Sequence, residues 1–334
     1  MTSNSDLEKF ISLLEEELEF AKKRSGRKSK KTDEEYLRLA EAIIKKSEAK
    51  NISIENALKD TSSPRTFYKR ISALRWFVIR KTSEFGIDDN KHNRQEIPLL
   101  IKCLEALKRC RENGFNGTRE KRKSKRASIS RLPQNWLEVL CNGANQSPYY
   151  KPLLIASISG CRPSEIANGV KLWISYNDAM NENCLNIQIC GTKVNQNQGQ
   201  ESRTLIFKAS HKNSILQNLI AELEKSENHH EMVTLKNANN FTQEIRRMCK
   251  LLWPKHRHSI TAYSLRHQAA SDFKRFLLPD DVSRALGHAS SKTKKTYGSA
   301  SQSKSALAPD IILSTREVKI ALVKKIRKED SFEP

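Results

Sequence analysis

Apolar residues in the first third of the chain recur every three or four positions, which is the period of an amphipathic α-helix. The first such stripe lies within residues 6–24 and consists of Leu7, Phe10, Ile11, Leu14, Leu18 and Ala21. Residues 33–115 continue the pattern over several helices, without the alternation that is typical of strands. The stripe on residues 6–24 requires a covering surface, which is either another subunit or the chain's own helices.

From Leu132 onward the pattern is again helical, with one exception. Residues 183–207 alternate apolar and polar side chains on both sides of a turn rich in Asn, Gln and Gly, which predicts a β-hairpin and is the only clear β signal. Residues 314–328 carry apolar positions at helical spacing among basic residues. This predicts a basic amphipathic tail helix, packed in cis or on a neighbouring protomer. The expected fold class is mainly α with a small β-hairpin or sheet.

The length of 334 residues exceeds that of most single domains, so we expect two domains with additional segments. The predicted parts are an N-terminal amphipathic helix at 1–26, a helical core domain at 27–115, a basic linker at 116–131 and a second domain, with the tail helix, at 132–334. The linker contains Gly117 and no large apolar residue before Ile129, as expected for a segment outside both cores.

Charge narrows the choice of partners. The chain has 60 Lys and Arg residues against 38 Asp and Glu residues, a formal net charge of +22, which attracts polyanions. Basic and aromatic residues alternate within residues 63–81, as in a helix that follows a DNA backbone. The candidate DNA contacts are Arg65, Lys69, Arg70 and Arg75 there, and Lys121, Arg122, Lys123, Lys125 and Arg126 in the linker. Both stretches are alternatively solvated basic faces, and charge alone leaves RNA and anionic membranes open.

Several other classes of protein are disfavoured. The seven cysteines form no C-x-x-C pair, which favours reduced thiols in the cytoplasm, on a nucleoid or in a host cell. A polar, acidic start and the lack of any run of 18 apolar residues argue against secretion and membrane spanning. His256 and His258 have no carboxylate or cysteine at ligand spacing, so no metal is expected. No glycine-rich phosphate-binding loop is found, so no nucleotide cofactor is expected.

Three short motifs follow one another in the second half of the chain. SISGCRPSEI carries Arg162 and Glu165 at the start of a helix, YSLRHQAASDF carries Arg266, and ALGHASSKTKKTY carries His288 and Tyr297. Each motif alone is a weak indication. In their order and spacing, the three resemble the tyrosine site-specific recombinases, the family of phage integrases and chromosome-dimer resolvases.

The resemblance implies a two-domain, clamp-like architecture in which residues 27–115 bind double-stranded DNA and residues 132–334 hold the active site. It implies cutting and rejoining of DNA, as in recombination and integration by mobile genetic elements. The acting form is expected to be a homo-oligomer, a tetramer on paired sites. The catalytic residues that it implies are Arg162, Lys193, Tyr263, Arg266, His288 and Tyr297.

The attack of a phenol on a phosphodiester requires these residue types. Negative charge develops on the nonbridging oxygens, and the guanidinium groups of Arg162 and Arg266 can each fork onto two phosphate oxygens. The leaving 5′ oxygen needs a proton, which Lys193 on the predicted hairpin turn supplies. Tyr297 becomes a 3′-phosphotyrosine that conserves the bond energy for rejoining, so neither metal nor ATP is required.

Two positions leave alternatives open. Lys208 and Lys212 follow Lys193 on or near the hairpin and are alternative proton donors. Tyr263 stands where the family usually has a histidine, and a phenol with a pKa of about 10 is not cationic at neutral pH. Tyr263 therefore supports a second hypothesis, a DNA-binding relative that has lost turnover. A third is a type IB topoisomerase-like enzyme that acts without paired sites.

Overall fold

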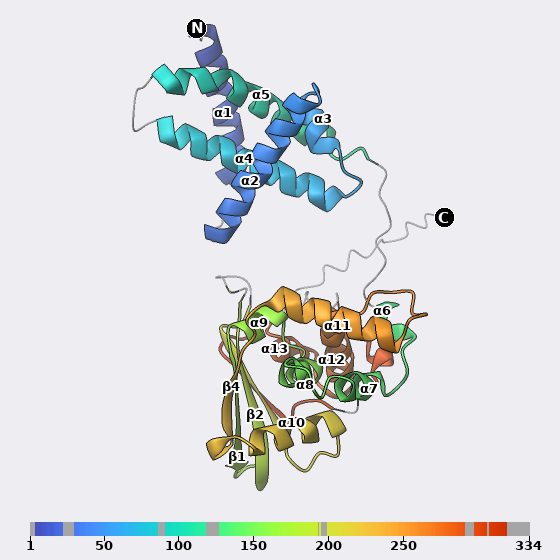
Figure 1. The fold of residues 1–334 in the computed structure, drawn as a ribbon. Helices are drawn as coiled ribbons and strands as arrows, with labels where there is room; N and C mark the ends of the chain where they lie inside the picture. Colours follow the sequence, from blue (N-terminus) through green and yellow to red (C-terminus); the bar gives the residue numbers. More distant parts are fainter. Residues whose placement is uncertain are drawn as a thin grey trace, which may run out of the picture. The chain divides into compact units, whose positions relative to one another are not determined.

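The computed structural model describes residues 4–22, 30–85, 91–117, 127–192, 194, 199–290, 297–305 and 307–318. Contacts divide the chain into two compact units, Met1–Arg122 and Lys123–Pro334 (Figure 1). Within the described part of the chain, no helix is both long enough and apolar enough to cross a membrane.

The described residues of the first unit form only helices. They are α1 (Asn4–Lys22), α2 (Lys30–Ala49), α3 (Ile54–Lys59), α4 (Pro64–Phe85) and α5 (Lys91–Asn113). α2 and α5 pack against α4, whose Phe67 and Leu74 are fully buried. α1 packs along α5 and buries Phe10, whereas Leu7 and Ile11 of its apolar stripe stay exposed. The stripe on α1 is therefore covered in part by helices of its own chain.

Two basic residues that we expected to contact DNA are engaged inside the first unit. Arg75 forms an ion pair with the buried carboxylate of Glu17 on α1. Arg70 donates hydrogen bonds to carbonyl oxygens at the C-terminal end of α3. Their donors face protein acceptors, and DNA contact by Arg70 and Arg75 stays a prediction. Arg65 and Lys69 remain exposed on α4, with Lys69 paired to a glutamate of α2.

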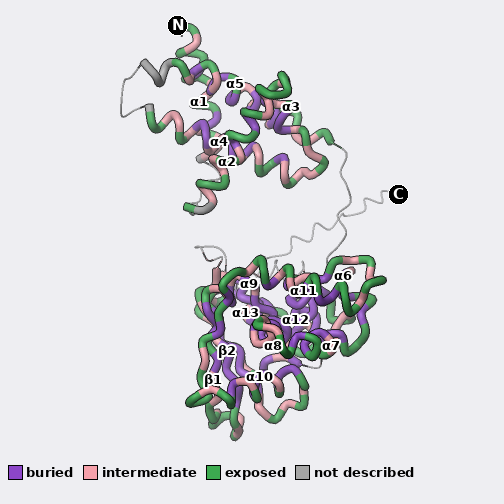
Figure 2. The backbone as a smooth tube through the Cα atoms, in the orientation of Figure 1, coloured by how far each residue is buried: buried purple, intermediate pink, exposed green. Residues whose placement is uncertain are grey.

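The second unit combines helices with one sheet. Its helices are α6 (Ala127–Ser130), α7 (Trp136–Asn142), α8 (Tyr150–Ser159), α9 (Pro163–Ala167), α10 (Ser214–Glu224), α11 (Ala238–Leu252), α12 (Ala262–Phe276) and α13 (Pro279–Ala285). Short 3₁₀ turns are η1 (Glu227–His229) and η3 (Ala300–Gln302). α8 and most of α12 are buried, and they form the centre of the unit (Figure 2).

The sheet is larger than the predicted hairpin. Its strands are β1 (Val170–Asn177), β2 (Glu182–Cys190), β3 (Ser202–Lys208), β4 (His230–Val233) and β5 (Ile311–Ser314). They pair antiparallel in the order β4-β1-β2-β3-β5, and the sheet stands at one side of the helices (Figure 1). The hairpin β2–β3 is confirmed, and β1, β4 and β5 extend it to a five-stranded sheet. Ile189 pairs with Val170 and Arg203, which brings Arg203 to the end of the sheet near α9.

Two predicted boundaries are also corrected. A helix does not begin at residue 314, because residues 311–314 form β5 and the Arg316 N–H donates to Oε1 of Gln200 at 2.8 Å. A helix there would lose these backbone bonds; residues 319–328 lie outside the described residues. The predicted linker is too long, because α6 lies within it and buries Ile129 in the core of the second unit. Residues 121–126, with the five basic linker candidates, lie outside the described residues.

Helix α8 ends where it crosses α12. Gly160, directly after α8, has a φ of +62°, a left-handed conformation that favours glycine. An added Cβ at Gly160 would stand 2.9 Å from the Cβ of Ala269 on α12. Glycine therefore allows the close approach of these two helices.

We expect Gly160→Ala to lower the free energy of unfolding by about 1–3 kcal/mol, because left-handed backbone disfavours alanine and the methyl group overpacks α12. Gly143→Ala is the matched control, since Gly143 has a φ of −67° and an added Cβ there meets no atom closer than 3.4 Å. The control should change stability by less than about 1 kcal/mol. Urea unfolding measures both variants, and equal losses would contradict the packing argument.

Candidate active site

Arg162 is positioned by the helix that it begins. Pro163 occupies the first helical position of α9, where its fixed φ suits a helix start. The backbone N–H of Arg162 donates to Oε2 of Glu165 at 2.7 Å, and Nη1 donates to Oε1 at 2.6 Å. The Arg162 side chain is 13% exposed and that of Glu165 is fully buried. Glu165 therefore orients a guanidinium group that still reaches solvent.

Arg203 holds the other side of the Glu165 carboxylate. Both side chains are 0% exposed, and Nη2 of Arg203 lies 3.0 Å from Oε2 of Glu165. Nε of Arg203 donates to the carbonyl oxygen of Ala285, at the end of α13, at 2.8 Å. Burial alone would raise the pKa of Glu165, but the charges of Arg203, Arg266 and Arg162 lower it to about 2. Glu165 is therefore ionised and holds two cations in place.

The Arg203 guanidinium also explains the glycine of the third motif. Gly287 has a φ of +68°, and an added Cβ would stand 2.6 Å from Nη1 of Arg203. A larger residue would strain the backbone and push Arg203 away from Glu165. Gly287 therefore lets the turn before His288 close directly over Arg203.

Arg266 lies in the first half of α12 and is 1% exposed. Its Nη1 donates to the carbonyl oxygen of Gly160 at 2.6 Å, and its Nη2 donates to that of Leu286. Nη2 also lies 3.1 Å from Nε2 of His288. Nε of Arg266 is buried and has no hydrogen-bond partner among the described residues. An unsatisfied buried donor costs about 1–3 kcal/mol, so a bound acceptor at Nε would relieve that cost.

His288 is a neutral ring beside Arg266. A guanidinium group only donates, so Nε2 of His288 accepts and the ring hydrogen lies on Nδ1. Burial, followed by the charges of Arg266, Arg162 and Arg203, lowers the pKa of His288 to about 2. Nδ1 is also buried without a partner in the described part of the chain. The site thus offers a second N–H donor that lacks an acceptor.

Tyr297 lies against these residues. Its ring stacks on that of His288 with centroids 5.4 Å apart, and lies 5.3 Å from the ring of His267. Cζ of Arg266 is 5.0 Å from the centroid of the Tyr297 ring. Burial alone would raise the pKa of Tyr297, but the charges and hydrogen bonds of Arg266 and Arg162 lower it below its ordinary value. A phenol that loses its proton more readily is a better nucleophile.

Tyr263 lies beside this cluster on the first turn of α12. It is 37% exposed, whereas Arg266, three residues later on the same helix, is buried. Burial alone would lower the pKa of Arg162. The pKa is nevertheless raised, because the charges of Glu165, Tyr297 and Tyr263 favour the cation. Tyr263 is thus near Arg162 at the exposed edge of the site.

Lys193 lies outside the described residues, but the residue before it is placed. Oγ1 of Thr192 is 2.9 Å from Oγ of Ser164 on α9, the helix that Arg162 begins. The N-terminal end of the turn that carries Lys193 therefore lies beside α9.

Four of the six catalytic candidates come together, with a fifth at the edge of the cluster. Those in contact are Arg162, Arg266, His288 and Tyr297. Arg203 was not predicted, although the strand pattern contains an indication of it. Arg203, Leu205 and Phe207 alternate along β3 and so point to the same face, which puts an arginine in line with core residues. A buried arginine at such a position requires an anion, which is Glu165.

The site carries more positive than negative charge. Three guanidinium groups, those of Arg162, Arg203 and Arg266, surround the single carboxylate of Glu165, and His288 is neutral. Buried cations in excess of anions are unfavourable for the protein alone and favourable for a bound anion. No group of three or more His, Cys, Asp or Glu side chains that could hold a metal ion is found in the described residues.

No protein-family model and no curated protein matches the sequence. Among solved structures the chain is similar to the XerA recombinase, with 16% identity and a TM-score of 0.34 over 90% of this chain and 95% of that one. It is similar to the XerH site-specific recombinase bound to its difH substrate, with 15% identity and a TM-score of 0.36 over 70% and 66%. It is also similar to a lambda integrase dimer bound to a COC′ core site, with 12% identity and a TM-score of 0.43 over 86% of this chain and 76% of that one. These three TM-scores are all below 0.5.

We expect His288 to stay neutral, with its hydrogen on Nδ1, from about pH 8 down to about pH 5. Its pKa of about 2 lies below that range, and its protonation would place a second cation against Nη2 of Arg266. Nitrogen NMR of protein labelled at histidine reports both charge and tautomer, and His288→Gln assigns the signal. A ring that becomes cationic between about pH 5 and pH 7 would contradict the contact with Arg266.

Proposed function

We propose that this protein is a tyrosine recombinase that cuts and rejoins double-stranded DNA through a 3′-phosphotyrosine at Tyr297. The observation that carries the proposal is the Tyr297 phenol held by Arg162 and Arg266, in a site with more cations than anions. A phosphodiester suits such a site, because negative charge grows on its nonbridging oxygens during attack. The order and spacing of the three sequence motifs support the same function.

The proposed step exchanges one ester bond for another. The oxygen of Tyr297 attacks phosphorus, the phenol gives up its proton, and the bond from phosphorus to the 5′ oxygen breaks as that oxygen gains a proton. Arg162 and Arg266 bind the nonbridging oxygens and stabilise the transition state. Rejoining is the reverse reaction, in which a 5′ hydroxyl attacks the phosphotyrosine. The number of ester bonds is unchanged, so the step needs neither ATP nor a metal ion.

His288 acts in this proposal as a hydrogen-bond donor. Its Nε2 is occupied by Arg266, so accepting the phenol proton there would break that bond and place two cations in contact. Nδ1–H, like Nε–H of Arg266, is available for a nonbridging phosphate oxygen. The proton of Tyr297 then passes to water, helped by the two arginines that lower its pKa.

Lys193 is the proposed acid for the leaving 5′ oxygen. Lys208 lies at the far end of β3 from Arg203, about 16 Å away at the usual rise per residue, and Lys212 lies beyond that end. The turn that carries Lys193 starts at Thr192, which contacts α9. The two alternative lysines are therefore unsuited to the role.

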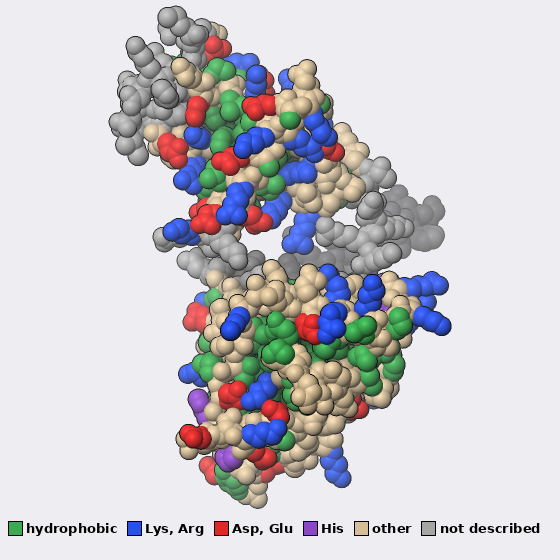
Figure 3. Space-filling model, in the orientation of Figure 1, with side chains coloured by type: hydrophobic (Ala, Val, Ile, Leu, Met, Phe, Trp, Pro, Cys, Tyr) green, Lys and Arg blue, Asp and Glu red, His purple; other side chains and the backbone are tan. Residues whose placement is uncertain are grey.

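A basic surface beside the site supports DNA as the substrate. Lys and Arg side chains gather over α11 and beside α6 in the second unit (Figure 3). Two grooves there are lined by Arg131, Arg246, Lys250, Lys255 and Arg257, and none of the described residues that line them is acidic. The loop at residues 253–261 continues directly into α12, whose first turn carries Tyr263. We assign this surface to the phosphate backbone that flanks the cleaved position.

Further contacts and assembly complete the proposal. Arg65 and Lys69 on α4 and the basic residues at 121–126 are proposed to bind the same DNA away from the cleaved bond.

Exchange of strands between two duplexes requires several active sites at once, so a homo-oligomer, a tetramer on paired sites, is the proposed acting form. We place this activity in the cytoplasm, on a nucleoid or in a host cell.

A DNA-binding protein without turnover is the second candidate, and Tyr263 is the observation that favours it. A histidine at this position could supply a positive charge near Arg162, whereas a neutral phenol supplies only a hydrogen bond. The two functions share the basic surface and differ only in covalent chemistry at Tyr297.

Tyr297→Phe is expected to abolish a covalent protein–DNA adduct while changing DNA affinity by less than about twofold, because the ring still stacks on His288. Denaturing gels after incubation with nicked suicide substrates detect the adduct, and mass spectrometry locates the modified peptide. Tyr176→Phe is the matched control, since Tyr176 is 57% exposed on β1. An adduct on another residue would exclude Tyr297 as the nucleophile.

Tyr263 separates the two candidate functions. In an active enzyme, Tyr263→Phe should slow cleavage by about 10-fold or more, equivalent to about 1.4 kcal/mol of transition-state binding, with unchanged DNA affinity. Tyr263→His should retain or raise the rate. A wild type that forms no adduct, beside a Tyr263→His variant that does, would favour the DNA-binding protein.

A further inference from the structure

The chain that follows Tyr297 runs along α12. An added Cβ at Gly298 would stand 2.1 Å from Oγ of Ser271, so the backbone passes this helix without room for a side chain. Nζ of Lys274 donates hydrogen bonds to the carbonyl oxygens of Tyr297, at 3.2 Å, and of Gly298. The helix that carries Arg266 therefore also binds the backbone of the proposed nucleophile.

Asp272, one turn and a half beyond Arg266, binds the next part of the same segment. Oδ1 of Asp272 accepts hydrogen bonds from the Ser303 hydroxyl at 2.7 Å and from the backbone N–H groups of the two following residues at 3.0 Å each. Nε2 of Gln268 donates to this oxygen at 3.1 Å and to the carbonyl oxygen of Gln302 at 3.1 Å. The buried carboxylate thus ties residues 303–305 to α12, and Gln268 ties residue 302 to the same helix.

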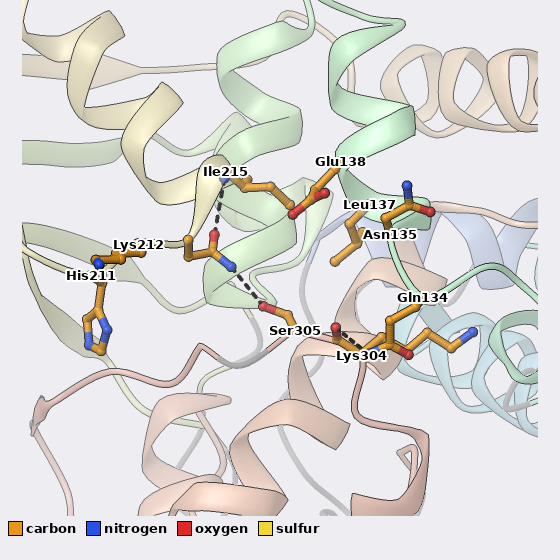
Figure 4. A pocket seen from close by; sticks show the side chains of 10 residues that line it. Gln134, Asn135, Leu137, Glu138, His211, Lys212, Ile215, Lys304 and Ser305 are labelled. Carbon is orange, nitrogen blue, oxygen red and sulfur yellow. Dashed lines mark hydrogen bonds between the residues drawn. The ribbon is translucent and has the colours of Figure 1, made fainter.

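Residues outside α12 bind the same segment. Nδ2 of Asn213 donates to Oγ of Ser305 at 3.2 Å, and Nε2 of Gln134 donates to the carbonyl oxygen of Lys304 at 2.9 Å. Figure 4 shows these residues around a cavity of about 400 Å³ that they line. The Lys304 ammonium group donates to a carbonyl oxygen of the loop before α7. Residues 303–305 are therefore bound to α12 and to the segments that precede α7 and α10.

The burial of Asp272 is unfavourable for folding. The residue is 2% exposed, and burial raises the pKa of its carboxyl to about 6 against the opposing hydrogen bonds. The groups that lower this pKa are hydrogen-bond donors, with no cation among those identified in the described residues. A buried carboxylate without a counter-ion is costly, so a role in folding alone does not account for it.

We propose that Asp272 is a positioning residue for Tyr297, which it holds in cis against Arg266 by anchoring residues 303–305 to α12. The inference rests on the proposed role of Tyr297 as the nucleophile. Arg266 and Asp272 belong to one helix, so the phosphate clamp and the anchor of the nucleophile segment form one rigid element. Loss of the anchor releases the phenol from this geometry without changing the arginines.

Two variants of Asp272 separate anchoring from folding. Asp272→Ala removes every acceptor, whereas Asp272→Asn keeps one oxygen for the Ser303 hydroxyl and the two backbone N–H groups. In a single turnover on suicide substrates, Asp272→Ala should form the adduct about 10²-fold more slowly, the size of effect expected from a displacement of about 1 Å. DNA affinity should stay within about twofold, and Asp272→Asn should recover most of the rate.

Leu223→Ala controls for a general loss of stability. Leu223 is buried on α10, and its truncation should cost about 2–5 kcal/mol without touching the nucleophile segment. The proposal predicts a lowered melting temperature and a normal rate of adduct formation for this variant. An equal loss of rate in Leu223→Ala, or an asparagine variant as slow as the alanine variant, would overturn the positioning role.

Hydrogen exchange tests the anchor without reference to activity. Asp272→Ala should speed amide exchange in peptides that cover residues 297–305 and leave peptides of α8 unchanged. Unchanged exchange at 297–305 would overturn the proposal whatever the rates. A wild type that forms no adduct would overturn the proposed function instead, and exchange would still decide whether Asp272 anchors the segment.

Discussion

The second unit depends on one buried carboxylate held between two arginines. Glu165 binds Arg162 on one side and Arg203 on the other, and Arg203 in turn binds the end of α13. The ionised group is tolerated in the interior because two cations contact it, and removal of either partner would leave an uncompensated charge. The position of this carboxylate therefore fixes α9, β3 and the turn to His288 relative to one another. The shape of the anion site follows from that arrangement.

Helix α12 provides the second half of the site, and its residues have two tasks. Near its start, Arg266 binds the ends of α8 and α13 through their carbonyl oxygens, and its Nε has no partner among the residues that the structure describes. Further along, Lys274 and Asp272 bind the backbone on the C-terminal side of Tyr297. A rigid helix thus sets the distance between the clamp and the phenol. His288 must be neutral for its ring to contact Arg266 on this helix, since a charged ring would repel the guanidinium group.

Local patterns predicted the parts of this structure that depend on local sequence. The helical class and the β2–β3 hairpin follow from periodicity, and the first motif predicts the helix that begins beside Arg162. The remaining features depend on contacts between distant residues. β5 pairs with β3 across about a hundred residues, and its four residues, Ile311–Ser314, show no local strand pattern without that partner edge. The partner of Arg75 is on α1, and the donors to Asp272 follow Tyr297, so neither this ion pair nor the anchor at Asp272 could be predicted from local sequence.

The anchoring of Tyr297 has a kinetic consequence for the proposed reaction. The chain between His288 and Ser303 is attached at both ends to the same unit, through the turn at Gly287 and through Asp272. Such a double tether gives the phenol a high effective concentration at the arginines, so attack resembles an intramolecular reaction. After the proposed cleavage, the 3′ end of the DNA is covalently attached to Tyr297 and is therefore held by the same two attachments. The 3′ phosphate stays within reach of the arginines that activated it, and the choice of which 5′ hydroxyl next approaches then decides whether the original strand is restored or a new one is made.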